Sequence, residues 1–137
     1  MEANIAQAQR GLYLIGRVLL GLYFIIPGIT KITGWAATVE YMAAHGVPLI
    51  PVLLVLTIII QVGGGISLLI GYREQLMAFV LAGLTIVISL FMHDFWNMEE
   101  GIQRAHETQN FIKNLAIAAG LMCVAGMGPA TRSIRAG

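Results

Sequence analysis

Four apolar runs separated by short polar segments dominate the pattern of this chain. A helix needs about 20 mostly apolar residues to cross about 30 Å of hydrocarbon, and each run is close to that length. Leu53–Ile60 shows none of the alternation expected of a strand in an outer-membrane barrel. The pattern therefore predicts an all-α membrane protein, a four-transmembrane-helix bundle that forms a single domain over residues 1–137. The expected spans are Leu12–Thr30, Pro51–Ile70, Leu76–Met92 and Phe111–Met127.

The connections between the runs add two expectations. Trp35–Ala44, in the first long connection, combines strong helix formers with aromatic residues at interfacial spacing. This composition predicts a short interfacial helix that Gly46 and Pro48 terminate. The Gly71–Glu74 turn is so short that the second and third spans should be antiparallel neighbours.

The distribution of basic residues predicts the orientation, because cytoplasmic loops carry an excess of lysine and arginine. A four-span chain has both termini on one side, and the count is five against three in favour of that side. We therefore expect a multi-pass protein of the plasma (inner) membrane with both termini cytoplasmic. The first apolar run also has features of a signal peptide, but we expect it to be a retained span. The majority side would hold Arg10, Arg17, Arg73, Arg132 and Arg135, and the other side Lys31, Arg104 and Lys113.

Composition supports the membrane class and excludes several functions. Apolar residues make up 58% of the 137 residues and charged residues 11%, where a soluble domain has about 25% charged residues. A net charge of +1 argues against nucleic acid as a partner. Cys123 is the single cysteine, and the chain lacks a haem-attachment motif, a cysteine pair and a Rossmann glycine pattern. Whether the protein is an enzyme stays open, but it should not be a complete oxidoreductase by itself.

Polar residues within the runs are informative because each costs free energy in lipid unless it has a partner. Gln61 lies near the middle of the second span, where it would bond to another helix or to a ligand in the bundle. Gly63–Gly65 follows and permits either close helix packing or room for a flat ligand. Arg17, inside the first span, would either snorkel to the headgroups or pair with a polar group in the bundle.

A polar stripe at helical spacing runs along the third span to its outer end. Its members are Thr85, Ser89 and His93. Serine and threonine can bond to their own helix, whereas His93 can relay protons or bind a metal. The acidic residues that follow it, Glu107 among them, fit no metal-ligand spacing, so we expect no metal site. On the fourth span, Ala116 and Gly120 form a small-residue pair typical of helix packing.

The predicted topology brings several of these polar side chains, from different elements, to the outer interface of the membrane. Gln61 lies deeper in the bilayer than the others. Independent snorkelling of each group is one explanation. A shared polar pocket that opens outward is the other, and it gives each group a partner or a ligand. The candidate ligand-binding residues are Lys31, Gln61, His93, Trp96, Lys113 and Asn114.

Several short motifs follow one another in a characteristic order. They are Arg17–Phe24 with Gly28-Ile-Thr-Lys31, Tyr41–Ala43 with Gly46-Val-Pro48, Gly64-Gly65 with Leu68–Gly71, His93–Trp96, and Phe111–Ala116. In this order and spacing the chain, from about Gly16 to Pro129, resembles the DoxX family of small four-span membrane proteins. Many members carry glutamate where this chain has Gln61, so an argument that needs a titrating carboxylate there does not apply.

The resemblance implies a redox context, since the family's namesakes are associated with thiosulfate:quinone oxidoreductase and other members with redox or stress partners. One hypothesis is a redox-linked subunit that binds a quinone-like molecule in the outer pocket. The alternatives are a non-enzymatic accessory subunit of a larger membrane complex and a small-molecule transporter that works as an oligomer. In each case the partners are the lipid bilayer and a second protein or further copies of this chain.

Overall fold

The computed structural model of this chain describes residues 1–127, which form α-helices and one short 3-10 helix. This part of the chain contains no β-strand, so the all-α prediction is confirmed. The elements are α1 (Glu2–Thr33), α2 (Trp35–Ala44), α3 (Ile50–Ile70), α4 (Glu74–Met92), η1 (Phe95–Asn97) and α5 (Ile102–Ala125). Pro129, Arg132 and Arg135, which entered the resemblance and the charge count, lie outside the described residues.

Within residues 1–127, the segments long and apolar enough to cross a membrane are Glu2–Thr33, Ile50–Ile70 and Glu74–Asn97. They contain the first three expected spans, although α1 begins at Glu2 rather than at Leu12. α5 begins at Ile102 rather than at Phe111, so its first turns carry polar and charged residues. Those turns make α5 less apolar than the other three, and its crossing of the membrane stays a prediction.

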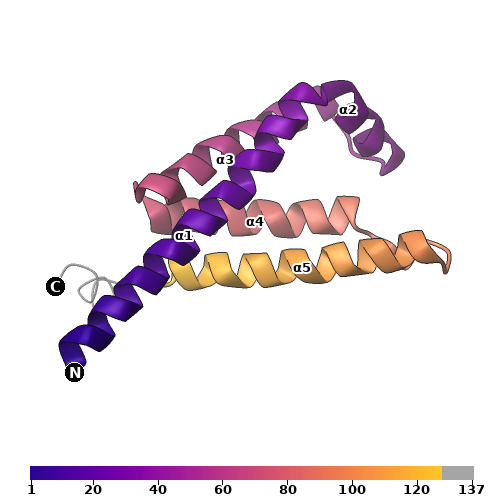
Figure 1. The fold of residues 1–137 in the computed structure, drawn as a ribbon. Coiled ribbons are helices and arrows are strands. Elements are labelled where there is room, and N and C mark those ends of the chain that lie inside the picture. The colour runs from indigo at the N-terminus through magenta and orange to yellow at the C-terminus, as the bar shows by residue number, and fades with distance from the viewer. Residues whose placement is uncertain (128–137) are drawn as a thin grey trace.

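The helices are arranged as two pairs, as Figure 1 shows. α1 packs mainly against α3, α4 packs mainly against α5, and the contact between α3 and α4 joins the pairs. α1 and α5 touch each other little. One end of the bundle carries α2 and the connection from α4 to α5, and we call it the His93 end. The other carries the turn from α3 to α4, beside Arg17, and we call it the Arg17 end. The first turns of α1 extend beyond the other helices at the Arg17 end.

Glycines bring α1 and α3 into close contact. A Cβ on Gly65 would lie 2.7 Å from the carbonyl oxygen of Gly21, and one on Gly28 would lie 2.6 Å from Cγ2 of Val62. Small residues at a helix interface let the backbones approach and increase van der Waals contact in a membrane. Gly21 and Gly28, on one face of α1, therefore mark the contact of this helix with α3.

The hydrophobic core lies toward the Arg17 end. It includes Phe24 of α1 and residues from the last turns of α3, the first half of α4 and the last turns of α5: Leu68, Ala78, Leu81, Ala82, Leu121 and Val124. At this end, Gly71 ends α3 with a φ of 77°, a left-handed conformation that glycine adopts without strain. The turn then places Glu74 within 2.7 Å of Arg17. Arg17 therefore pairs with a polar group inside the bundle, and this is the second of the two alternatives that the sequence left open.

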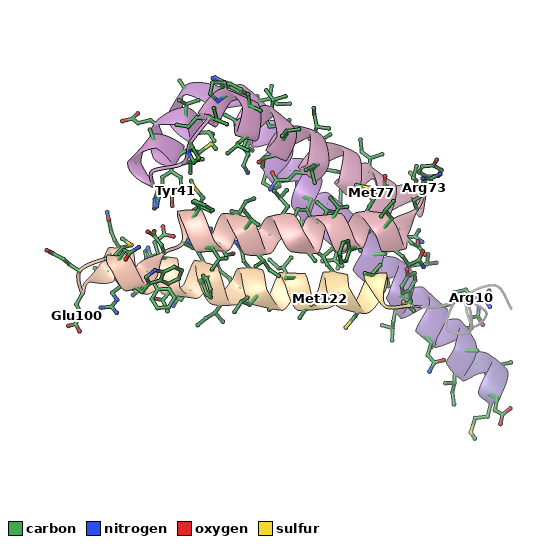
Figure 2. All side chains as sticks on the ribbon, turned by 180° about the vertical axis from the view of Figure 1, so that it is seen from behind. Arg10, Tyr41, Arg73, Met77, Glu100 and Met122 are labelled. Carbon is green, nitrogen blue, oxygen red and sulfur yellow. The ribbon has the colours of Figure 1, made fainter. Side chains whose placement is uncertain are left out.

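α2 has the bounds that the sequence indicates, Trp35–Ala44. Gly46 follows it with a φ of 70°, and Pro48 then leads toward α3. A helix in the first long connection is thus confirmed, while its location at the membrane surface stays a prediction. Figure 2 shows Tyr41 of α2 facing the end of α4, so α2 closes over the His93 end of the bundle.

Candidate ligand-binding site

Two adjoining cavities lie at the His93 end. The first, which we call the central cavity, has a volume of about 320 Å³ and lies between the two helix pairs, with residues of α1, α3, α4 and α5 around it. The second, the α2 cavity, has a volume of about 400 Å³ and is bounded by α1, α2, α3 and α4. Lys31, Ile88 and His93 line both cavities, so the two spaces meet at these side chains.

Five of the six predicted site residues line the central cavity, although they come from separate elements. They are Lys31 of α1, Gln61 of α3, His93 just after α4, and Lys113 and Asn114 of α5. Trp96 does not line it. The residue is 46% exposed, and its ring packs edge-on against Phe95 and Phe111, with ring centroids 5.2 and 5.6 Å apart. The structure therefore gathers the five polar residues and leaves the aromatic residue outside.

Gln61 is the most unusual side chain of the central cavity. The residue is only 5% exposed, and its Oε1 atom has no hydrogen-bond partner in the structure. A buried amide atom left in this state costs about 1–3 kcal/mol. The interhelical hydrogen bond that would have explained Gln61 structurally is thus not formed at Oε1, and a molecule in the cavity could satisfy this atom.

The polar stripe of α4 is largely satisfied within its own helix. Thr85 Oγ1 donates to the Leu81 carbonyl at 2.7 Å, and Ser89 Oγ donates to the Thr85 carbonyl at 2.9 Å. Hydroxyl groups in helices often bond in this way. His93, the last member of the stripe, is the one whose side chain bonds to another helix.

His93 is held by a carboxylate on α5. Its Nδ1 atom lies 2.5 Å from Oε2 of Glu107, and both side chains are mostly buried. Tyr41 of α2 donates to the other oxygen of Glu107, Oε1, at 3.1 Å, and its hydroxyl also lies 3.3 Å from the Met92 carbonyl. Glu107 therefore links α2 to the end of α4 and fixes the imidazole that lines both cavities.

A second histidine–carboxylate pair strengthens this closure. Nδ1 of His45, at the end of α2, lies 3.2 Å from Oδ1 of Asp94.

The pKa of Tyr41 is raised to about 12, first by burial and then by the hydrogen bond and negative charge of Glu107, with a further contribution from Asp94. The Tyr41 hydroxyl consequently keeps its proton, and its hydrogen bond to Glu107, throughout the physiological pH range.

Lys31 and Lys113 bring two positive charges to the central cavity from two helices, α1 and α5. Lys31 Nζ makes one hydrogen bond, at 3.5 Å, to the Pro27 carbonyl in the preceding turn of α1. The ion pairs among residues 1–127 include neither lysine. No carboxylate lines either cavity, so the site is basic.

α1 and α5 meet at one side of the central cavity. These two helices touch each other little, and Tyr23 is joined to Asn114 across the gap by one long hydrogen bond of 3.5 Å. Both residues line the cavity. Few interactions therefore hold α1 and α5 together beside the cavity.

Glu107 and Tyr23 belong to the site but are not among the candidate residues that the sequence indicates. Sequence reasoning considered Glu107 only as a metal ligand, and it did not consider Tyr23. No periodic spacing connects Glu107 to His93, because they belong to different elements, and the bond depends on how α5 is rotated. Pairing each interfacial histidine with a nearby carboxylate would have been the available signal. Residues 1–127 contain no group of three metal-ligating side chains close enough to share an ion.

The long apolar helices and the polar cavity between them define the class, a helical membrane protein. The family model described as DoxX matches residues 12–94, and this chain belongs to that family. It is 37% identical over 121 residues to the inner membrane protein YqjF of Escherichia coli K12, covering 88% of this chain and 87% of the relative. It is 30% identical over 131 residues to the inner membrane protein YphA of the same organism, covering 96% and 93%. No solved structure matches the chain.

Proposed function

We propose that this protein is a quinone-binding subunit of a redox system in the plasma (inner) membrane. The observation that carries the proposal is the central cavity, where hydrogen-bonding groups from four parts of the chain surround a space in an apolar bundle. Such a cavity, mostly apolar with a few convergent polar groups, is typical of small-molecule sites.

The chemistry of a quinone headgroup suits this lining. The ring is flat and apolar, and the apolar side chains of Phe24, Ile88 and Ile117 line the cavity. Its two carbonyl oxygens accept hydrogen bonds, which Lys31, His93 and Lys113 can donate. Quinones dissolve in the bilayer, and the sparse contact between α1 and α5, at Tyr23 and Asn114, is the lateral entrance that we propose for them.

The proposal includes an architecture and an orientation. α5 is the fourth span, α2 lies at the membrane surface, both termini are cytoplasmic, and the cavities open toward the outer face. In a Cys123→Ser background, Glu100→Cys should react with a membrane-impermeant maleimide in intact cells, and Tyr72→Cys should not. Labelling of Tyr72→Cys alone would reverse the orientation.

The function is tested by purifying the full chain in a mild neutral detergent and extracting it for quinone analysis. We expect quinone to co-purify in an amount comparable to the protein. A Gln61→Leu variant should retain less of it, and Gln75→Leu, outside the cavity, should retain as much as the wild type. Absence of quinone, together with no binding of added 2-methyl-1,4-naphthoquinone, would contradict the proposal.

A second candidate is an accessory subunit that packs against another membrane protein. One feature favours it: the small-residue face of α5 has no partner among residues 1–127. Ala116 is exposed, and a Cβ added to Gly120 would meet no atom within 4 Å. Native mass spectrometry of the membrane-extracted protein distinguishes the candidates, because it reports a bound small molecule, a stoichiometric protein partner, or the homo-oligomer that a transporter would need.

A further inference from the structure

The charged side chains that line the central cavity are all basic. Lys31 of α1 and Lys113 of α5 line it, and no aspartate or glutamate does. Glu107 is the carboxylate bonded to a lining residue, and its two oxygens are already taken by His93 and Tyr41. Nothing on the cavity wall is therefore placed to neutralise the two ammonium groups.

The other charged groups of this part of the chain do not serve the lysines either. Each ion pair within residues 1–127 joins other groups, namely Arg17 to Glu74, His45 to Asp94 and His93 to Glu107. An unpaired ammonium in a medium of low dielectric constant is costly, and the half-buried Lys31 is closer to that state than the exposed Lys113. Two of them beside one cavity gain most from a ligand of opposite charge, because the attraction between charges strengthens as the dielectric constant falls.

We propose that the central cavity binds its ligand as an anion, a flat apolar ring that carries an ionised oxygen between Lys31 and Lys113. Gln61, which lines the same cavity, donates from its amide Nε2 to a second oxygen of the same ring. This inference rests on the proposed quinone-binding function and specifies the charge of the bound molecule. It predicts that the site discriminates between ring ligands of equal size by charge.

Two naphthoquinones of nearly equal size provide the test. 2-Hydroxy-1,4-naphthoquinone is an anion at neutral pH, and 2-methyl-1,4-naphthoquinone is neutral. Binding of each to the full-length protein in neutral detergent is measured at pH 7 by equilibrium dialysis. We expect the anionic ring to bind at least tenfold more tightly, and the advantage to shrink as salt is added.

Charge-removing variants show whether the lysines cause the preference. Lys31→Met and Lys113→Met should each reduce the preference for the anionic ring at least threefold while binding of the neutral ring persists. Arg104→Met removes one positive charge near the same end of the bundle, outside the central cavity, and should leave the preference unchanged. If Lys31→Met loses both probes, Lys113→Met, whose side chain is exposed, decides alone.

The remaining outcomes separate this inference from the function on which it rests. Equal binding of both rings overturns the inference and leaves quinone binding intact. Binding of neither ring overturns both. An anionic phospholipid carries the same charge, so the dialysis is repeated with phosphatidylglycerol added to the detergent. If the lipid displaces the anionic ring completely at equimolar concentration, the site prefers a lipid phosphate, and the ring ligand is overturned.

Discussion

Both ends of the bundle hold a mostly buried pair of opposite charges, but the space around the two pairs differs. Arg17 and Glu74 lie 2.7 Å apart with side chains 13% and 2% exposed. Gly71 lies so close that a Cβ on it would be 2.7 Å from Nη1 of Arg17. His93 and Glu107, at the other end, border cavities of about 320 and 400 Å³.

The difference shows what distinguishes a structural ion pair from one beside a binding site. Among residues 1–127 the apolar core lies beside the Arg17–Glu74 pair, and that pair joins α1 to the turn between α3 and α4. The His93 end has cavities and two lysines that belong to none of the ion pairs within residues 1–127. A buried charged pair does not indicate function by itself, whereas a pair beside a cavity with convergent polar groups makes that cavity a candidate site.

The largest effect should come from Glu74→Gln at the Arg17 end. The substitution leaves the Arg17 guanidinium without its anionic partner, which costs about 3–5 kcal/mol at a buried site. Unfolding in detergent with increasing sodium dodecyl sulfate measures the loss of stability. Glu100→Gln, at an exposed position, should change stability by no more than about 0.5 kcal/mol. Equal effects of the two substitutions would remove the structural role assigned to this end.

A pair of glycine substitutions tests how tightly the Arg17 half is packed. Gly65→Ala should cost about 1–3 kcal/mol, as overpacking does, because its Cβ would lie 2.7 Å from the Gly21 carbonyl oxygen and from Cγ1 of Ile25. Gly63→Ala meets no atom within 4 Å and should stabilise the helix by up to about 1 kcal/mol. The same unfolding assay compares them, and a reversed order would show that α1 and α3 are loosely packed.

At the His93 end, substitution should affect the ligand more than the fold. His93→Ala should weaken binding of 2-methyl-1,4-naphthoquinone by about 1–3 kcal/mol, the cost of leaving a polar partner unsatisfied. The bundle should still fold because His93 lies beyond the last turn of α4. His106→Ala, at an exposed position of α5, is the control. Unchanged binding in His93→Ala would mean that the polar groups act separately.

The smallest effect is expected for Tyr41→Phe, which removes a hydroxyl bonded to Glu107 at the exposed edge of the site. The pKa of Tyr41 rises from 10.0 to about 12 on folding, so its contribution to stability is fully present below pH 10 and lost as pH rises toward about 12. The difference in stability between wild type and variant should therefore shrink over this range. A difference that stays constant to pH 12 would contradict the bond to Glu107.

Much of this comparison follows from the sequence, because lipid makes polar residues conspicuous. The all-α class follows from the length of the apolar runs, and the bounds of α2 follow from its helix formers and the glycine and proline after them. The expectation that Lys31, Gln61 and His93 share a pocket follows from the cost of unpartnered polar groups. The bond from Arg17 to Glu74 and that from His93 to Glu107 do not. Periodicity shows which face of a helix is polar, but not how that helix is rotated against its neighbours.

The position of Trp96 and the early starts of α1 and α5 also differ from the sequence-based expectations for physical reasons. Trp96 is one of the candidate residues at the outer interface, but edge-on packing against Phe95 and Phe111 satisfies an aromatic ring without any cavity. α1 and α5 begin earlier than the apolar runs because a helix does not need apolar residues to continue into water. Apolar patterning therefore locates the membrane-facing part of a helix and not its ends.

The extended start of α1 gives the molecule a stalk. The residues from Glu2 to Gly11 precede the first apolar run and continue the same helix, which adds about 15 Å at 1.5 Å per residue. If the apolar run fills the bilayer, this rod stands clear of the lipid headgroups and keeps a fixed direction. A fluorescent protein joined directly to Met1 should therefore report a defined distance and angle from the membrane, which a flexible terminus would not provide.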